Sequence, residues 1–313
     1  FKQKTAYEIM PSLVGSEMCI RDRDWCLSRL CSACQWRRLP ACLLRRTRPA
    51  CRGYSLAEVV WQMNLELSIG GLKLSTPLIA ASGLFGYGDG YCGLVETSSF
   101  GAVVTKTITR QKRDGNPPPR LVDFECGLIN SIGLENVGVD RFLEEVLPEL
   151  EIGTRLIVSI GGSEIEEYAE IARRLSRSGR IDAVEVNISC PNIRQGGIAF
   201  GSDAGVTREV IGKVRSQTNH LLIAKLPPLI VGIEEIAVAA QEAGADAITI
   251  ANTYPAMSID IESERPVLGA ITGGLSGRAI KPMSLRLVWT AFTKLNIPII
   301  ASGGIENATD CIE

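Results

Sequence analysis

The sequence predicts a (β/α)₈ barrel preceded by a short N-terminal β-hairpin. From Asn64 onward, short apolar segments alternate with amphipathic segments of helical period. Near-continuous apolar strands between helices are typical of a parallel sheet that is covered on both faces. Glycine or polar residues end the predicted strands, which favours a closed barrel with its site at those ends over a doubly wound sheet.

The elements follow from the pattern in chain order. The hairpin comes first, because "NLELSIGGLKLS" places Gly70 and Gly71 between two short segments. Helices are predicted over Glu164–Ser178 and Ile233–Ala243, each followed by a glycine-containing turn into a strand. Seven apolar strands are predicted at 76–83, 101–107, 154–162, 181–190, 220–228, 245–253 and 297–304.

No eighth strand follows the seventh in this sequence. We therefore expect a barrel whose eighth strand is missing, so that the edges of the first and seventh strands stay unpaired. A chain of this kind is expected to fold poorly or to bind a cofactor poorly.

Composition restricts the class of protein. The chain has 313 residues, of which 45% are hydrophobic and 22% are charged, as in a soluble globular protein. The net charge of −2 gives no indication of nucleic acid or an anionic membrane as a partner. No apolar run approaches the roughly 18 residues that a membrane-spanning helix requires.

Residues 1–62 are interpreted as a leader that is disordered or foreign to the protein, and 63–313 as the barrel domain. The leader carries a net charge of +6, six of the ten cysteines and no regular period. Its CxxC at Cys31 and Cys34 has no nearby histidine, so we give a zinc site odds of roughly 1 in 10. An arginine-rich transit peptide is a second alternative. "PSLVGSEMCIRDR" is better explained as translated sequencing adapter, with Met63 as the true start.

The predicted strand ends carry lysines, amides and one thiol. They contain no cluster of His, Asp and Glu, and the single histidine, His220, begins a strand at the opposite end. This argues against a metal site and against a Ser-His-Asp triad. A strand lysine also occurs in Schiff-base aldolases. Two lysines with amides and a Gly-rich turn better suit a phosphate-bearing flavin, FMN, because positive charge stabilises the reduced flavin.

Five motifs in order, "GNPPPR", "NSIGLEN", "VNISCPN", "ITGGLSG" and "ASGG", closely resemble the dihydroorotate dehydrogenase family. The resemblance extends from Asn64 to the last residue. It implies a cytoplasmic FMN enzyme of pyrimidine biosynthesis that oxidises (S)-dihydroorotate to orotate. Cys190 resembles the base of the soluble class 1 enzymes, and "NSIGLEN" is most similar to the NAD-linked class 1B branch.

The resemblance also implies roles for individual residues. Cys190 would take a proton from C5 of dihydroorotate while C6 delivers hydride to flavin N5. A thiol suits this role because its pKa of about 8.5 is near the working pH. "CPNIRQGGIAFG" is similar to the flexible loop that carries the base and closes over the substrate. Substrate contacts would come from Lys106, Asn130, Ser131, Ile132, Gly133, Leu134, Asn187, Asn192, Asn252 and Thr253. FMN contacts would come from Ala81, Ser82, Gly83, Lys106, Thr107, Asn187, Lys225, Asn252, Gly277, Gly303 and Gly304.

Asn130 and Asn136 are also compatible with simple turn roles, and Gly86–Gly90 is more typical of a turn than of a nucleotide loop. Pro227 and Leu229 depart from the family's usual polar residues after Lys225. The class 1B resemblance implies a homodimer joined to a partner subunit with FAD and a [2Fe–2S] cluster, together a heterotetramer. Two alternatives remain, a flavin domain like that of dihydropyrimidine dehydrogenase and an inactive barrel fragment.

Overall fold

The computed structural model describes residues 18–21, 65–89, 95–188 and 198–313. The predicted hairpin is present as β2 (Leu67–Ile69) and β3 (Leu72–Leu74), which pair antiparallel. Gly70 and Gly71 form its turn with φ of 52° and 93°, values that fit a two-residue hairpin loop. Ile69 and Leu74 pack against apolar side chains inside the barrel, so the hairpin covers the amino-terminal end of the strands.

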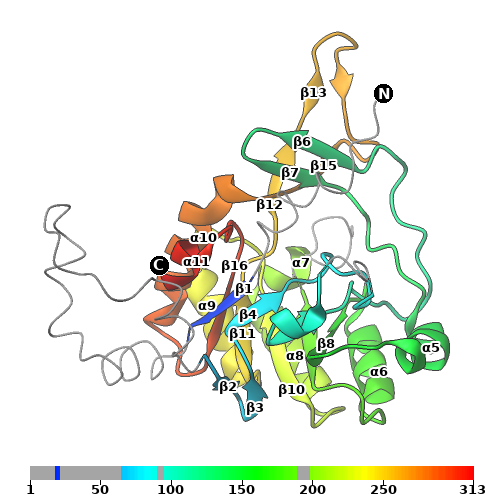
Figure 1. The fold of residues 1–313 in the computed structure, drawn as a ribbon, viewed down its shortest axis with the longest axis vertical. Helices are drawn as coiled ribbons and strands as arrows, with labels where there is room; N and C mark the ends of the chain where they lie inside the picture. The colour runs from blue at the N-terminus through cyan, green and yellow to red at the C-terminus, as the bar shows by residue number, and fades with distance from the viewer. Residues whose placement is uncertain (1–17, 22–64, 90–94, 189–197) are drawn as a thin grey trace, which may run out of the picture.

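Seven parallel strands confirm the predicted barrel, and each lies within its predicted range (Figure 1). Every neighbouring pair in this series is parallel, which places all seven carboxyl ends at one end of the barrel. In spatial order they are β4 (Leu78–Ala80), β5 (Ala102–Val104), β8 (Arg155–Ile160), β9 (Ala183–Asn187), β10 (Leu221–Lys225), β11 (Ala247–Ile250) and β16 (Ile299–Ser302).

The eighth position of the barrel is occupied by β1 (Met18–Arg21), which pairs antiparallel with both β16 and β4. The prediction that the edges of the first and seventh strands stay unpaired is therefore wrong. Strand edges present unpaired N–H and C=O groups, and an extended segment such as β1 pairs with them. Apart from this strand, the assignment of 1–62 as a leader stays a prediction.

Helices cover the outside of the barrel in the order α6, α8, α9 and α10. The predicted helices at 164–178 and 233–243 are confirmed. In α6 the buried residues are Tyr168, Ile171, Ala172 and Leu175, the spacing of one helical face. The helices are α5 (Val139–Arg141), α6 (Ile165–Leu175), α7 (Ile198–Gly201), α8 (Ala204–Arg215), α9 (Ile233–Glu242), α10 (Lys281–Phe292) and α11 (Ala308–Ile312). The other helical segments are the π-helical Phe142–Val146 and the 3₁₀ helices Thr97–Ser99, Leu147–Glu149 and Arg278–Ile280.

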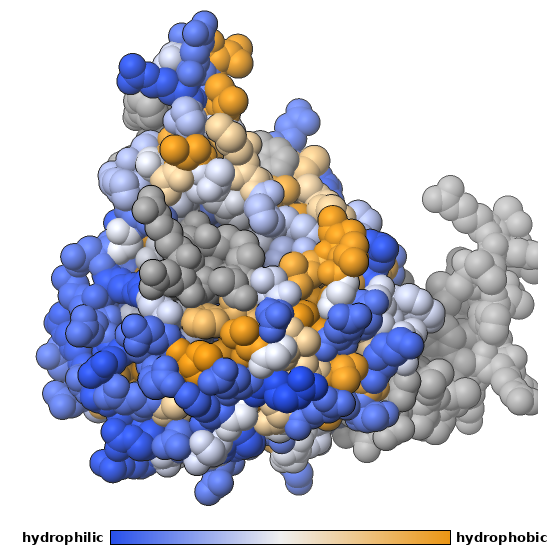
Figure 2. Space-filling model, turned by 180° about the vertical axis from the view of Figure 1, so that it is seen from behind, coloured by the Kyte–Doolittle hydropathy of each residue, from blue (hydrophilic) through white to orange (hydrophobic). Residues whose placement is uncertain are grey.

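An accessory arm that the sequence analysis did not predict projects from the end of the barrel opposite the hairpin (Figure 1). Its main sheet has the order β12–β15–β7–β6, and a second hairpin, β13–β14, lies at its tip. Figure 2 shows hydrophobic residues on this projection, where Ile259 and Ile261 are exposed. The strands are β6 (Leu121–Phe124), β7 (Gly127–Asn130), β12 (Tyr254–Met257), β13 (Ile259–Asp260), β14 (Arg265–Pro266) and β15 (Thr272–Ser276).

Two hydrophobic layers hold the barrel together. The larger lies between the strands and the outer helices and includes Val158, Val186 and Ile248. The smaller fills the inside of the barrel and includes Ile157, Ile223 and Ile300. Among the described residues, no helix combines the length and apolar character that crossing a membrane requires.

Candidate active site

Side chains facing the inside of the barrel change from apolar to polar along the strands. Side chains two residues apart on a strand share a face. Because Ile157, Ala183, Ile223 and Ala247 face the inside of the barrel, the residues at every second position further along each strand also face inward. That set is buried and polar: Ser159, Glu185, Asn187, Lys225 and Thr249. These residues lie toward the carboxyl ends of their strands, where barrels of this kind build active sites.

Asn187 lies at the centre of a hydrogen-bonded group of side chains. Its Nδ2 donates to Thr107 Oγ1 at 3.0 Å, and its Oδ1 accepts from Asn252 Nδ2 at 3.3 Å. Thr107 Oγ1 lies 3.0 Å from Ser159 Oγ, and the Tyr168 hydroxyl donates to the Asn187 carbonyl oxygen at 3.1 Å. The structure thus brings together three predicted site residues from three strand ends.

The accessory arm meets this group through Thr253. The Thr253 N–H donates to Asn252 Oδ1 at 2.8 Å. A Cβ atom on Gly274, in β15, would lie only 1.9 Å from Thr253 Oγ1, so glycine is required for this approach. Asn130 Nδ2 donates to the Gly274 carbonyl oxygen at 3.2 Å. Asn130 is therefore a residue of the arm. It is connected to the end of the barrel through Gly274, which contacts both Asn130 and Thr253.

Lys225 and Glu185 form a buried pair inside the barrel. Their side chains are 7% and 1% exposed, and Lys225 Nζ lies 3.8 Å from Glu185 Oε1. Thr249 Oγ1 donates to Glu185 Oε2 at 3.2 Å. Lys225, the last residue of β10, therefore places a cationic group near the carboxyl end of the barrel.

Lys106, just past β5, is half-buried and packs over an aromatic ring. Its Nζ lies 5.6 Å from the centroid of the Tyr87 ring, within the range of a cation–π contact. The Tyr87 hydroxyl accepts from the Val137 N–H at 2.9 Å. Burial raises the pKa of Tyr87 above its ordinary value. This tyrosine lies in Gly86–Gly90, a segment that the sequence predicts to be a turn rather than a nucleotide-binding loop. Residues 86–89 do form a turn.

The segment Ser131–Leu134 crosses from the arm toward the barrel. Ser131 is buried, and its Oγ accepts from Asn116 Nδ2 at 2.9 Å. Leu134 has a φ of 55°, in the left-handed region that a non-glycine residue seldom adopts. Asn136 Oδ1 accepts from the N–H groups of Thr109 and Gly138, so its turn role is confirmed. The predicted contacts Ile132 and Gly133 lie in this same segment.

Gly303 and Gly304 follow β16 with φ values of 106° and 79°. Neither lies in a strand or helix, and no backbone hydrogen bond joins either N–H group to another described residue. A Cβ on Gly304 would lie 2.8 Å from the Lys281 backbone nitrogen, so this turn packs against the start of α10. Free N–H groups in a glycine turn beside a helix start are a concave site for an anion.

The other predicted cofactor residues lie at the ends of further strands. Strand β4 is followed by Ala81, Ser82 and Gly83. The neighbouring strand, β5, ends just before Lys106 and Thr107. Gly277 follows β15 in the arm, where a Cβ would meet the Gly127 Cα at 2.6 Å. Cys190 and Asn192, the predicted base and one substrate amide, lie outside the described residues.

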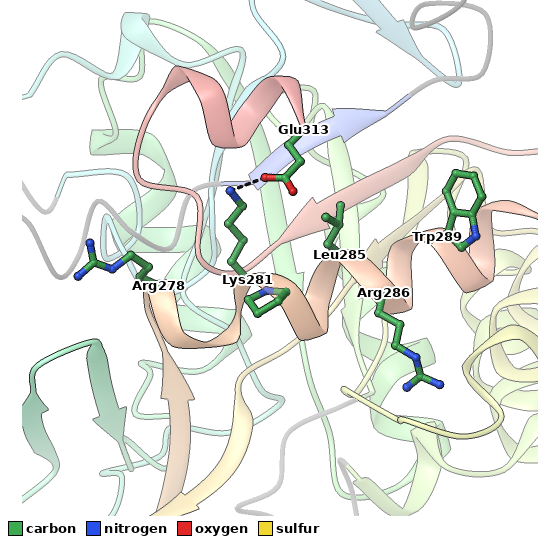
Figure 3. Close-up of a pocket in the computed structure, with 7 residues that line it drawn as sticks. Arg278, Lys281, Leu285, Arg286, Trp289 and Glu313 are labelled. Carbon is green, nitrogen blue, oxygen red and sulfur yellow. Dashed lines mark ion pairs between the residues drawn. The ribbon is translucent and has the colours of Figure 1, made fainter.

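Two cavities lined by described residues lie away from this site. One, of about 700 Å³, lies along α10 and is lined by Arg278, Lys281, Pro282, Leu285, Arg286, Trp289 and Glu313. In Figure 3 its side chains extend along the outside of α10, with Lys281 and Glu313 paired at 2.6 Å. The other, of about 630 Å³, is lined by residues between Asp140 and Arg180. Neither contains a predicted site residue.

Several polar residues of the site were not predicted from the sequence, among them Tyr87, Ser159, Glu185 and Thr249. A signal existed for Glu185, because "AVEVN" places one acidic residue in a buried apolar strand. Burial of a charged side chain is costly unless the charge is paired, so such a residue has a partner nearby. The other three resemble ordinary strand or turn residues in the sequence.

Comparisons with known proteins agree in the family they indicate. A family model described as "Dihydroorotate dehydrogenase" matches residues 64–313. The chain is 48% identical over 252 residues to "Dihydroorotate dehydrogenase B (NAD(+)), catalytic subunit" of Caldicellulosiruptor saccharolyticus, covering 80% of this chain and 83% of that protein. It is 43% identical to the protein of the same name from Bacteroides thetaiotaomicron, with the same coverage. A solved structure of DHODH from Eimeria tenella in complex with ferulenol has a TM-score of 0.61, 28% identity and coverage of 79% of this chain and 74% of that one.

Proposed function

The chain belongs to the dihydroorotate dehydrogenase family, and on that premise we propose that it oxidises dihydroorotate to orotate in pyrimidine biosynthesis. It is an oxidoreductase, and its relatives are named as catalytic subunits of the NAD(+) form. The observation that carries the proposal is the convergence of Thr107, Asn187, Asn252 and Lys225 at the carboxyl end of the barrel.

We propose FMN as the cofactor, and the residues present fit it. The N–H groups of Gly303 and Gly304, which donate to no backbone carbonyl of another described residue, suit the FMN phosphate. Buried Lys225 supplies a positive charge near the site, which suits the electron-rich ring of a reduced flavin. Ala81, Ser82, Gly83 and Gly277 would complete the cofactor contacts. The chemistry that FMN supplies when bound is acceptance of a hydride at N5.

The substrate would be held by amide side chains. Asn130, Asn187, Asn252 and Asn192 offer both donors and acceptors, which suit a planar ring with carbonyl and N–H groups. Lys106 would attract the substrate carboxylate, and Ser131–Leu134 and Thr253 would line the same space. Cys190 would take the proton from C5. A thiolate near neutral pH accepts a proton and returns it to solvent, as a general base requires.

The experiment is anaerobic mixing of the FMN-loaded full chain with (S)-dihydroorotate. Loss of the visible flavin absorbance on mixing is the expected result. Dihydrouracil, which lacks the carboxylate, serves as the matched comparison and is expected to leave the absorbance unchanged. Bleaching by dihydrouracil but not by dihydroorotate would reject the proposal in favour of a dihydropyrimidine-reducing enzyme.

We further propose that the electrons reach NAD through a partner subunit with FAD and a [2Fe–2S] cluster. The name "catalytic subunit" in the relatives supports the existence of such a partner. The proposed assembly is a homodimer of this chain with two partner subunits. NADH formation from dihydroorotate only when both chains are present is the expected result. Equal NADH formation by this chain alone would contradict the partner.

A further inference from the structure

The pair formed by Glu185 and Lys225 is enclosed by the barrel. Glu185 lies in the middle of β9 and Lys225 at the end of β10, where Lys225 is the register partner of Asn187. On the other side of β10, Lys225 is the register partner of Thr249 in β11. The backbone of Lys225 is therefore level with that of Asn187. Glu185 is the preceding inward-facing residue of β9 and lies closer to the amino-terminal end of the barrel.

The Glu185 carboxylate is held from one side only. Its Oε2 accepts from Thr249 Oγ1 at 3.2 Å. Its Oε1 is buried and accepts no hydrogen bond within the described part of the chain. Lys225 Nζ lies 3.8 Å from Oε1, which is close enough for an ion pair but beyond hydrogen-bond distance. Thr249 therefore fixes the orientation of a carboxylate whose free oxygen faces the lysine.

Stability alone does not account for this pair. Taking two charges out of water costs more than their attraction commonly returns, and apolar side chains of similar volume often stabilise a core better. The deeper inward-facing residues around the pair are in fact apolar, including Ala183, Ile223 and Ala247. A buried carboxylate in this position is therefore better explained by what it does to Lys225.

We propose that Glu185 is a positioning residue for Lys225. Its carboxylate, oriented by Thr249, holds the lysine ammonium inside the barrel, next to the strand ends where the proposed flavin would lie. This inference rests on the proposed function, because the ammonium would act on a cofactor that the proposal assigns. Without the carboxylate the ammonium has no buried counter-charge, and nothing fixes its position beside the flavin.

The first arm of the experiment uses cofactor-free full-length protein and tests the pairing alone. Urea unfolding is compared for the parent, Glu185→Gln, Lys225→Met and the double variant. Removal of one partner leaves the other charge buried and unpaired, so each single variant is expected to lower the urea midpoint. The double variant is expected to regain part of the loss. Strictly additive losses would overturn the pairing, since non-interacting sites add.

The second arm measures the dissociation constant of FMN by titration of flavin fluorescence. Glu185→Gln is expected to weaken FMN binding about tenfold in the parent background and less than about twofold in the Lys225→Met background. An equal loss in both backgrounds, or no loss in either, would overturn the positioning role. Glu185→Leu, which also removes the charge, gives the same comparison if the glutamine variant folds poorly.

The matched control is Glu242→Gln, which removes a carboxylate from an exposed ion pair with Arg208 on the outer helices. Its FMN dissociation constant is expected to equal that of the parent. A parent that binds no FMN overturns both the cofactor proposal and the direction of Lys225 toward it. The unfolding comparison then still decides whether Glu185 holds Lys225, so the two failures are distinguishable.

Discussion

Asn252 Nδ2 donates to Asn187 Oδ1 at 3.3 Å, although the two residues are 65 positions apart and β10 separates their strands. The same Asn187 donates to Thr107 Oγ1 from a third strand end. Because each amide both donates and accepts, this arrangement fixes the orientation of both side chains before a substrate arrives. The proposed substrate contacts are thus preorganised by the barrel itself.

Asn187→Ala is expected to destabilise the protein as well as to impair substrate binding. The change removes one hydrogen-bond partner from the buried Thr107 hydroxyl and one from the Asn252 side-chain amide. A buried polar group that loses its partner costs about 1–3 kcal/mol. Urea unfolding measures this loss, and Asn296→Ala, at an exposed position, is the control expected to stay within about 0.5 kcal/mol. Equal midpoints for Asn187→Ala and the parent would show that the network is not formed.

Gly304→Ala is expected to destabilise the turn after β16. Gly304 has a φ of 79°, and an added Cβ would lie 2.5 Å from the Lys281 Cβ. Both the strained backbone and the overlap oppose alanine, so a loss above about 1 kcal/mol is expected. FMN affinity is expected to fall as well, because the turn moves away from α10.

Gly212→Ala serves as the opposite control for that variant. Gly212 lies inside α8, and an added Cβ meets nothing within 4 Å. Alanine in a helix interior is expected to stabilise the protein by about 0.5–1 kcal/mol. Thermal unfolding of the two variants is therefore expected to shift in opposite directions, and shifts of the same sign would contradict the assigned backbone conformations.

The attachment of α11 to α10 is expected to depend on pH through Asp310. Lys281, followed by the Glu306 N–H, lowers the pKa of Asp310 below its ordinary value of 3.8. A lowered folded-state pKa contributes stability above 3.8, which is lost as the pH falls through the folded-state value. The same pair raises the pKa of Lys281. The stability that Lys281 contributes is present at pH values below its ordinary pKa of 10.5. It is lost as the pH rises through the raised pKa of the folded state.

Asp310→Asn tests this pH dependence. Its destabilisation relative to the parent is expected to be full at about pH 7 and smaller at about pH 3, since below 3.8 the unfolded chain takes up a proton on Asp310 more readily than the folded protein does. Urea midpoints of both proteins at the two pH values provide the measurement. A difference that is independent of pH would mean that Asp310 stabilises α11 through its shape alone.

Cys190→Ser is expected to retain FMN and to lose most turnover near neutral pH. A hydroxyl is a much weaker base than a thiolate there, and general base catalysis typically contributes 10²–10⁴-fold. The residual rate is expected to rise with pH more steeply than that of the parent. Stopped-flow flavin reduction measures both effects, and an unchanged rate at neutral pH would remove Cys190 from its assigned role.

Much of the fold was predictable from local patterns. The apolar strands lie within their predicted ranges because barrel strands are buried on both faces and need apolar side chains throughout. The Gly70–Gly71 turn was predictable because few residues adopt positive φ at two successive positions. The arm was not predicted. Its strands are short and partly exposed, and β7 pairs with β15 across more than 140 residues.

The ends of the strands and the polar side chains that stand there can be read from the sequence, because period and turn chemistry are local properties of the chain. Which of those side chains meet depends on the order and register of the strands in the folded barrel. Thr249 and Glu185, 64 residues apart, contact each other only after strand order and register place β11 beside β10 and β10 beside β9. The partner of a buried charge depends on strand order and register, so it cannot be read from any single segment of the sequence.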